Sequence, residues 1–306
     1  MPLIGAHCST AGGAWKAFDR GQKIGCKAIQ IFTKSNRRWK AAALKPKDIE
    51  RFHQRATESG FPVVAHASYL INLASPKENI WDKSIDAYFI EMDRCRQLGV
   101  PYLVMHPGAH TGSGYEAGIR RVAEAINLEH ERGDESAMPL LEITAGTGTT
   151  LGAEMGHFQS ILAQLKQPER LGICFDTCHA VGAGWDITTA EGYAAVMDEF
   201  EAKIGLDRIR CFHLNDSQYP LASHRDRHTH IGYGYCTLEP FRQLVNDARF
   251  TDVPMLLETP KNEAMEQDVV NMRVLRALMN GSEEHVSAEN LHTFWEGVEK
   301  KEGKDG

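Results

Sequence analysis

Eight short apolar runs, each followed by a longer stretch with helical periodicity, determine the architecture of this chain. The runs are rich in β-branched and aromatic residues, which is typical of strands buried on both faces. They span residues 3–7, 28–32, 62–67, 102–107, 139–144, 171–177, 209–216 and 253–260. Strands that alternate with helices form parallel sheets, because each helix carries the chain back to the start of the next strand.

The stretches between the runs have the spacing of amphipathic helices. Ile85, Phe89 and Met92 recur every three to four residues, and Gly99 stands where that helix should end. Eight such units without a break in composition favour a single closed (β/α)8 TIM barrel. A doubly wound sheet is the structural alternative.

The barrel domain should occupy residues 1–280. From about Gly281 the chain turns charged and ends in KKEGKDG, so residues 281–306 predict a poorly ordered C-terminal tail. No 20–50-residue repeat and no low-complexity segment interrupts the chain.

Composition excludes several classes of protein. The 34 basic and 41 acidic residues leave a net charge of −7, which excludes a uniformly basic nucleic-acid coat. No run approaches the ~18 uncharged apolar residues of a spanning helix, so we expect no membrane segment. The first residues lack the order of a signal peptide, and the seven cysteines are an odd, scattered set. Reduced thiols and a cytoplasmic location follow as expectations.

Potential metal ligands stand at the ends of six consecutive predicted strands. The C-terminal ends of barrel strands converge on one face, where active sites of this architecture lie. Three carboxylates and three imidazoles crowded together without a cation would repel one another or shift their pKa values severely, so the pattern predicts a metal site. The six residues are His66, His106, Glu142, Asp176, His213 and Glu258.

Two further clusters extend this site to nine candidate ligands. His179 follows Asp176 by three residues, and Asp226 and His228 stand two residues apart in an extended loop. Nitrogen and carboxylate ligands without thiolate suit zinc, with manganese or iron as alternatives. Because each ion needs about three protein ligands, nine ligands predict two or three ions with a shared carboxylate.

A basic stretch and an aromatic loop follow the second and third predicted strands. Residues 20–47 contain no Asp or Glu but nine basic residues, and the segment FTKSNRRWK within it should neutralise phosphates. Tyr69 follows the ligand His66 closely, and on the rim of the barrel it could wedge into a base stack.

These residues together resemble the endonuclease IV family of zinc-dependent apurinic/apyrimidinic endonucleases. The resemblance runs in order from Ile4 to about Leu278. It is carried by IGAH, FTKSNRRW, AHASYLINL, HPGAH, EITAGTG, DTCHA, HLNDS, DRH followed by IGYG, and LLETP. No single motif would suffice, but DTCHA, HLNDS and DRH in this sequence order are specific.

The resemblance implies a (β/α)8 barrel with three zinc ions. One zinc would be held by His66, His106 and Glu142, and Glu142 would bridge to a second. Asp176, His213 and Glu258 would complete that second site, and His179, Asp226 and His228 would hold the third. Every ligand position of the family has the matching residue type here.

The resemblance also implies a substrate and a reaction. Double-stranded DNA containing an abasic site would be cleaved 5′ to that site, leaving 3′-hydroxyl and 5′-deoxyribose phosphate ends, and blocked 3′ ends would be trimmed. Glu142 would be the catalytic carboxylate beside the attacking water. Arg37 and Tyr69 would be the wedge residues, Asn72 would contact the DNA backbone, and the protein would be a monomer.

Four positions depart from the pattern of the family. Ile143 stands where Asn is usual, Gln218 where Lys is frequent, Tyr233 where Glu is common, and Ala67 where some members have Asp. These changes spare the ligands but touch their surroundings, so we expect them to affect efficiency and substrate preference.

Two other functions compete with the DNA-repair hydrolase. A sugar isomerase or epimerase also carries Glu, Asp and His on barrel strand ends, but it would hold one or two metals. It has no use for His179, Asp226 and His228, or for the basic stretch. The other alternative is a damage-binding protein that has lost turnover, and its DNA binding would be equally tight with and without zinc.

Overall fold

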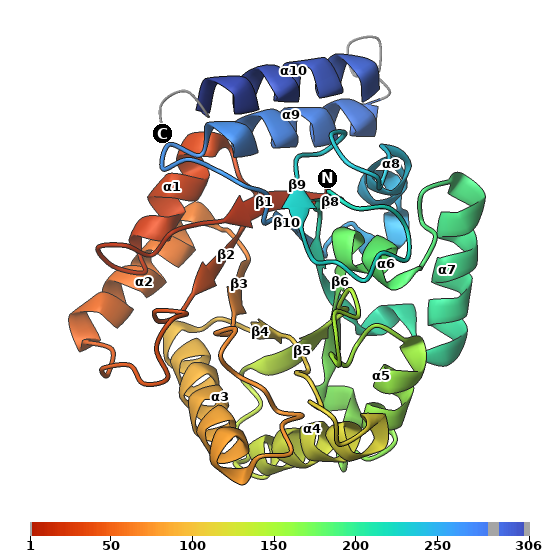
Figure 1. Cartoon of the computed structure of the whole chain (residues 1–306). Coiled ribbons are helices and arrows are strands. Elements are labelled where there is room, and N and C mark those ends of the chain that lie inside the picture. The colour runs from red at the N-terminus through yellow and green to blue at the C-terminus, as the bar shows by residue number, and fades with distance from the viewer. Residues whose placement is uncertain (1, 281–287, 303–306) are drawn as a thin grey trace.

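The computed structural model describes residues 2–280 and 288–302 as an eight-stranded parallel barrel with helices around it (Figure 1). The strands close in the order β1-β10-β7-β6-β5-β4-β3-β2. Each strand lies within one of the eight apolar runs or overlaps it, so the predicted barrel is confirmed and the doubly wound alternative is wrong. The barrel strands are β1 (Leu3–His7), β2 (Ala28–Phe32), β3 (Val63–His66), β4 (Tyr102–Met105), β5 (Met138–Glu142), β6 (Gly172–Asp176), β7 (Ile209–His213) and β10 (Pro254–Leu257).

Helices follow the strands and form the outer layer of the barrel. The predicted helix around Met92 is α3, which ends at Gly99 with a φ of 66° and is therefore capped in the left-handed conformation that glycine favours. The helices are α1 (Lys16–Ile24), α2 (Pro46–Ser59), α3 (Glu78–Leu98), α4 (Tyr115–His130), α5 (Met155–Leu162), α6 (Thr177–Ala183), α7 (Ala190–Lys203), α8 (Glu239–Asn246), α9 (Glu266–Asn280) and α10 (Ala288–Glu302). Short 3₁₀ turns η1 (Pro168–Arg170), η2 (Leu206–Arg208) and η3 (Ala248–Phe250) precede β6, β7 and β10.

The longest predicted apolar runs extend beyond the C-terminal ends of the strands that they contain. The run 209–216 contains β7, which ends at His213, and Asp216 already begins β8 (Asp216–Ser217). β8 pairs with β9 (His228–Thr229) as a small antiparallel sheet, with Ser217 opposite His228. The buried Asp216 carboxylate accepts four backbone N–H groups from residues 217, 232, 234 and 236, which turns the chain away from the barrel strand.

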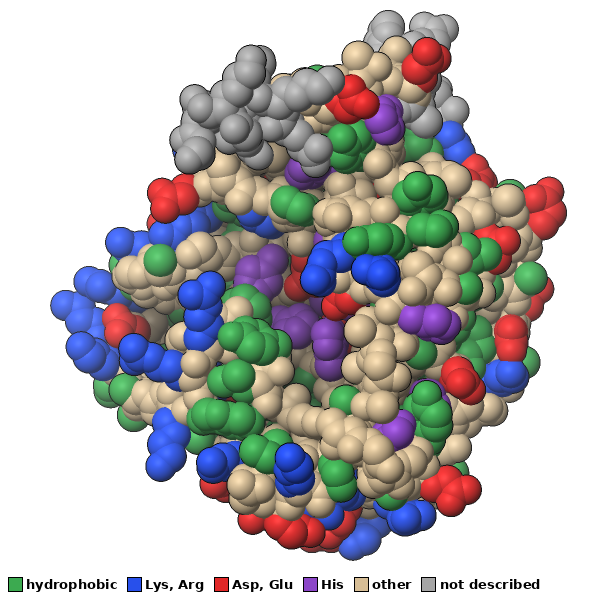
Figure 2. All heavy atoms as spheres, viewed as in Figure 1, with side chains coloured by type: hydrophobic (Ala, Val, Ile, Leu, Met, Phe, Trp, Pro, Cys, Tyr) green, Lys and Arg blue, Asp and Glu red, His purple; other side chains and the backbone are tan. Residues whose placement is uncertain are grey.

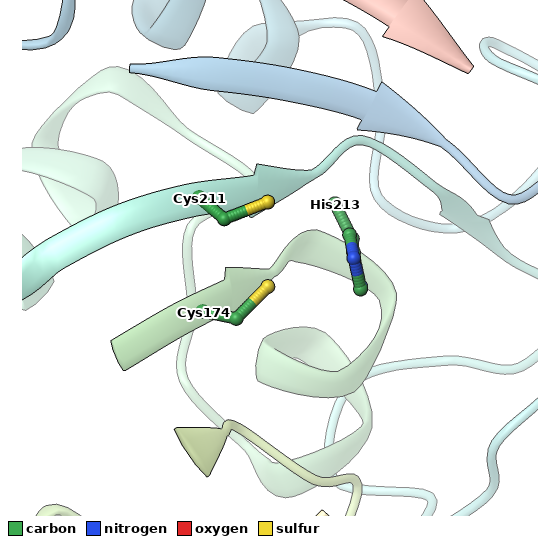
Figure 3. A group of neighbouring side chains, drawn as sticks. All are labelled: Cys174, Cys211 and His213. Carbon is green, nitrogen blue, oxygen red and sulfur yellow. The ribbon is translucent and has the colours of Figure 1, made fainter. Parts of the chain in front are cut away.

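An apolar layer fills the barrel interior. Seven barrel strands each contribute one fully buried side chain to it: Ala28, Val64, Val104, Leu140, Cys174, Cys211 and Leu256. Cys174 and Cys211 are register partners in β6 and β7, and Figure 3 shows their thiols on the same side as the His213 ring. All seven cysteines are unpaired and buried, as expected for reduced thiols. This layer closes off the barrel below its C-terminal face.

The C-terminal segment differs from the expected tail. Residues 288–302 form helix α10, which lies beside α9 (Figure 1). Trp295 is fully buried, stacks on His230 with 3.8 Å between ring centroids, and donates through Nε1 to the carbonyl of Ile231. The expectation of a poorly ordered tail is therefore wrong for 288–302, while 281–287 and 303–306 lie outside the described residues.

Among the residues that the structure describes, no helix is both long and apolar enough to cross a membrane.

Candidate metal centre

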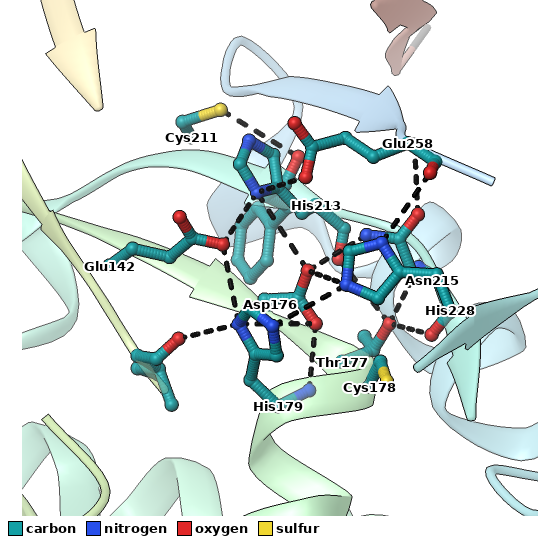
Figure 4. Close-up of polar contacts among 12 residues, drawn as sticks. Glu142, Asp176, Thr177, Cys178, His179, Cys211, His213, Asn215, His228 and Glu258 are labelled. Atoms are coloured by element: carbon teal, nitrogen blue, oxygen red, sulfur yellow. Dashed lines mark hydrogen bonds and ion pairs between the residues drawn. The ribbon is translucent and has the colours of Figure 1, made fainter. Parts of the chain in front are cut away.

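The nine candidate ligands come together at the C-terminal face of the barrel. His66, Glu142, Asp176 and His213 are the last residues of β3, β5, β6 and β7. Loops and short elements supply the others, which are His106 just after β4, His179 in α6, Asp226 before β9, His228 in β9 and Glu258 just after β10. Figure 2 shows histidines at the bottom of a hollow in this face, and Figure 4 shows how six of the nine lie.

Among the described residues, five groups of side chains could each hold a metal ion, and three of them consist only of the nine candidate ligands. The other two include thiols: Cys174, Cys211 and His213; and Asp176, Cys178 and His228. Within each of the three groups without a thiol, one nitrogen or oxygen atom from every member lies within 4.8 Å of the others. Glu142 is common to two of these three groups, so they adjoin through one carboxylate. The three groups are His66, His106 and Glu142; Glu142, Asp176, His213 and Glu258; and His179, Asp226 and His228.

Glu142 contacts histidines on both sides. Its Oε2 lies 3.1 Å from Nε2 of His66 and 3.1 Å from Nε2 of His106. Its Oε1 lies 2.9 Å from Nδ1 of His213 and 3.3 Å from Nδ1 of His179. A carboxylate with each oxygen directed at a different set of ligands has the geometry of a bridge between two cations.

The third group has two imidazole nitrogens facing each other. Nε2 of His179 lies 3.4 Å from Nε2 of His228, and 3.2 Å from Oδ1 of Asp226. A neutral imidazole has a single N–H, and in each of these rings Nδ1 has an oxygen partner that needs it. The two facing Nε2 atoms of neutral rings therefore share at most one proton. A cation between the three atoms would satisfy them all.

Four of the histidines are oriented by an oxygen on the side away from the ligand group. His66 Nδ1 contacts the carbonyl of Ala67, His179 Nδ1 that of Ile143, and His228 Nδ1 that of Glu258. His213 Nε2 lies 2.8 Å from the side-chain oxygen of Gln30. With a cation bound, these partners would accept the N–H of the outer nitrogen, and the lone pair of the inner nitrogen would face the metal, as in metal-ligating histidines.

Distances between ligand atoms match those around a tetrahedral ion. Bonds of about 2.0–2.1 Å to zinc place neighbouring ligand atoms roughly 3.3 Å apart. Several contacts in the three groups lie near this value, from 2.9 Å between Glu142 and His213 to 3.6 Å between Asp226 and His228. Larger separations also occur, such as 3.7 Å between Asp176 and His213. The donor set of imidazole and carboxylate is one that suits zinc.

The pKa values of the ion-free site show how strongly these groups interact. Burial alone would raise the pKa of Glu142, but His213 and His106 outweigh it and hold that pKa well below the usual value. Burial would lower the pKa values of His213 and His179, but neighbouring carboxylates outweigh burial and raise both pKa values well above 6.5. Without a cation, protons on His179 and His213 therefore balance the carboxylates around them.

Residues that support the ligands include some that the sequence analysis missed. Gln30 on β2 bonds to His213 and donates to Glu258 at 2.5 Å, and His7 at the end of β1 lies 3.8 Å from Glu258. Asn215 donates to Asp176 and accepts from the backbone N–H of Glu258. His7 ends a predicted strand just as His66 and His213 do, so the same strand-end rule could have found it.

The positions that depart from the family pattern have defined contacts. The Ile143 carbonyl orients His179, and its side chain is buried. Gln218 donates its amide to the carbonyl of His228 at 3.1 Å, and the Tyr233 ring lies 4.9 Å from that of His292 on α10. Ala67 is buried. None of these side chains belongs to a ligand group.

Two loops border the hollow, and we call them the rim loops: residues 33–45 between β2 and α2, and residues 67–77 between β3 and α3. Tyr69 is 65% exposed, and Arg37 is exposed with no side-chain hydrogen bond or ion pair among the described residues. The Asn72 side chain, unlike that of Arg37, is engaged: its amide nitrogen donates to the carbonyl of Ala109, and its oxygen accepts the backbone N–H groups of Ala74 and Ala109. One amide hydrogen of Asn72 is left for a ligand.

Basic side chains gather beside the hollow, over α2 and the loop before it (Figure 2). Of the nine basic residues between Arg20 and Lys47, seven are exposed: Lys23, Lys27, Arg37, Arg38, Lys40, Lys45 and Lys47. Lys34 is an exception to the predicted phosphate-binding segment, because its side chain is buried and its ammonium pairs with Glu91 at 3.0 Å. A cavity of about 680 Å³ lies between this region and the ligand Glu258.

The comparisons with known proteins agree with this geometry. A family model described as a Xylose isomerase-like TIM barrel matches residues 18–278. The probable endonuclease 4 of Chloroflexus aurantiacus (strain ATCC 29366 / DSM 635 / J-10-fl) is 50% identical over 285 residues, 92% of this chain and 100% of that protein. The crystal structure of endonuclease IV from Thermus thermophilus matches with a TM-score of 0.81 and 35% identity, over 92% of this chain and 100% of that chain.

A D-tagatose 3-epimerase-like protein also matches, with a TM-score of 0.70 and 18% identity, over 92% of this chain and 100% of that chain. An identity this low shows the shared barrel alone. The sugar-isomerase alternative gains no support from it, because that function leaves the group of His179, Asp226 and His228 without a role.

Proposed function

This chain belongs to the endonuclease IV family, and we propose that it is a DNA-repair endonuclease that hydrolyses the phosphodiester bond 5′ to an apurinic/apyrimidinic site. The products are 3′-hydroxyl and 5′-deoxyribose phosphate ends, and blocked 3′ termini are trimmed by the same chemistry. The observation that carries the proposal is the meeting of three ligand groups, two of them joined at Glu142, in a hollow beside a basic surface.

The centre holds three zinc ions in this proposal, one in each ligand group, and manganese or iron can replace zinc at one position. Bound zinc supplies two things that phosphodiester hydrolysis needs: it lowers the pKa of water, and it neutralises the phosphate oxygens. Support comes from the matching distances between ligand atoms and from the four histidines whose outer nitrogens are already engaged.

Glu142 is the catalytic carboxylate. Its two oxygens keep the first and second groups at a fixed spacing, and its depressed pKa keeps it ionised at neutral pH. An ionised carboxylate in this position accepts a hydrogen bond from the attacking water and orients it toward the phosphorus. Gln30 fixes the ring of His213, so that Nδ1 and not Nε2 faces Glu142.

The rim loops recognise the damaged DNA. Exposed basic residues around Arg37 neutralise backbone phosphates, which reconciles DNA binding with a net charge of −7. Arg37 and Tyr69 fill the space that the extruded abasic nucleotide leaves in the duplex. Asn72 contacts the DNA backbone through its remaining amide hydrogen.

We also propose that the enzyme acts as a monomer in the cytoplasm. The seven buried, unpaired cysteines suit a reducing compartment, where thiols persist.

The test is incision of a duplex that contains one abasic site, by protein stripped of metal with a chelator and then supplied with zinc. We expect incision on the 5′ side of the site only after zinc is restored. A protein that binds two or three zinc ions without incising this duplex would contradict the proposal and favour a sugar substrate. Equally tight DNA binding with and without zinc, and no turnover, would favour a damage-binding role.

A further inference from the structure

A buried carboxylate that takes no part in the metal centre lies behind the two rim loops. Glu91 stands in the middle of α3 and is 1% exposed. Its Oε1 accepts the backbone N–H of Ser68 at 2.9 Å and lies 3.0 Å from the ammonium of Lys34. Its Oε2 accepts the hydroxyl of Thr33 at 3.0 Å. One carboxylate therefore contacts both rim loops.

The rim loops are also bonded directly to each other, next to the residues that we assign to the DNA wedge. The Ser68 hydroxyl donates to the carbonyl of Asn36 at 2.6 Å. Ser68 immediately precedes Tyr69, and Asn36 immediately precedes Arg37. Lys34 donates to the carbonyl of Arg38 at 2.8 Å, so Arg37 lies between two anchored residues.

Stability alone does not account for this ion pair. The side chains of Lys34 and Glu91 are 2% and 1% exposed, and removing two charges from water offsets most of their attraction. A well-packed apolar pair of the same volume is often as stable or more stable. Unlike an apolar pair, these charged groups form directional hydrogen bonds, and the bonds fix the positions of the loop atoms that they contact.

We propose that Glu91 is a positioning residue for recognition of the abasic site. Through Lys34 and Ser68 it sets the spacing between Arg37 and Tyr69, so that both enter the duplex together. This inference rests on the proposed function and adds a residue to it that contacts neither DNA nor metal.

The variant Glu91→Gln tests the role, because the amide keeps the shape of the side chain but loses the charge that holds Lys34. The readout is the fluorescence of 2-aminopurine placed opposite a stable abasic analogue, which rises when that base unstacks. Stopped-flow mixing with zinc-loaded protein separates this step from incision. We expect unstacking to slow by about tenfold, within the range for residues that share a hydrogen-bond network. The zinc content and kcat should stay unchanged.

A merely structural role would not depend on the wedge. In a Tyr69→Ala background, adding Glu91→Gln should slow unstacking by less than about twofold, because the element that Glu91 positions is already gone. Glu129→Gln is the matched control. Glu129 is another fully buried carboxylate and pairs with Arg96, but it contacts neither rim loop. This control should leave unstacking unchanged.

Ser68→Ala covers the case in which Glu91→Gln fails to fold. It removes the bond from the Ser68 hydroxyl to Asn36 without burying an unpaired charge, and it should slow unstacking by about threefold, again only when Tyr69 is present. Equal slowing in the presence and absence of Tyr69 would overturn the role of Glu91. Unchanged unstacking in Glu91→Gln would overturn it as well. Failure of the unmodified protein to incise abasic DNA would instead overturn the proposed function, and the recognition role with it.

Discussion

The metal centre and the rim loops lie on the same face of the barrel, but the chain fixes them in different ways. Four of the nine candidate ligands end barrel strands and are placed by the register of the sheet: Asp176 and His213, for example, are direct partners in β6 and β7. Arg37 and Tyr69 lie on loops without regular structure, and side-chain bonds from Glu91 and Ser68 hold those loops. In the proposed enzyme, catalysis would therefore depend mainly on residues that the barrel positions, and recognition on loops that side-chain bonds hold in place.

This difference predicts that damage to the centre and damage to the rim have separable effects. Changes in the centre should remove metal and turnover but leave DNA binding at the rim largely intact. Changes in the rim should lower discrimination between damaged and undamaged DNA while metal content stays the same.

The largest effect is expected for Glu142→Gln. Loss of the bridging charge should lower incision by far more than the ~100-fold that loss of an outer-shell partner costs. At least one zinc ion per molecule should be lost, while circular dichroism should show a folded barrel. Glu129→Gln, which alters a buried carboxylate away from the centre, should stay active. Retained incision by Glu142→Gln, purified free of the unmodified enzyme, would refute the bridging role.

An intermediate effect is expected from pH in the ion-free protein. Burial opposes the shifts, yet neighbouring carboxylates raise the pKa values of His179 and His213 above 6.5, and the histidines lower that of Glu142 below 4.5. The histidines then contribute stability that is fully present below pH 6.5 and is lost as pH rises through their folded-state pKa values. Glu142 contributes stability that is present above pH 4.5 and is lost as pH falls through its folded-state pKa.

The metal-free protein should therefore be most stable between about pH 4.5 and 6.5, and its unfolding temperature should fall by a few degrees from about pH 6 to 9. Zinc should reverse this trend, because its ligands bind in their deprotonated forms. Thermal unfolding of chelated and zinc-loaded protein across this range measures both slopes. Parallel slopes for the two forms would mean that the nine residues do not hold the metal.

The smallest effect is expected at the rim. Tyr69→Ala should weaken binding to an abasic duplex by about tenfold, the amount that one lost aromatic stacking contact typically costs. Binding to undamaged duplex should change little, and the zinc content should not change. Fluorescence anisotropy with two duplexes that differ only at the abasic position measures the ratio. Equal losses on both duplexes would exclude the wedge role.

The same difference explains which features the sequence could predict. The strand ends were predictable because eight alternating apolar runs and helices favour a barrel, and a barrel directs residues such as Glu142 and His213 to one face. His7 ends its strand and obeys the same rule, whereas Gln30 does not look like part of a metal site when taken alone. Their roles appear only once the barrel brings β1 and β2 beside Glu258.

Features that depend on contacts between distant segments were not predictable. Lys34 looks like a phosphate ligand within FTKSNRRWK. Its burial becomes apparent only in the folded protein, where Glu91 from the middle of α3 pairs with its ammonium. Trp295 lies in a segment whose charged composition suggests disorder. Its burial depends on His230 and Ile231, which the barrel presents on the loop just after the ligand His228.

The most direct test of the account is a crystal structure of the zinc-loaded protein with anomalous diffraction recorded at the zinc absorption edge. We expect three anomalous peaks, one in each ligand group, with the carboxylate of Glu142 between two of them. A single peak, or a peak at the thiols of Cys174 and Cys211 in place of the shared carboxylate, would contradict the account.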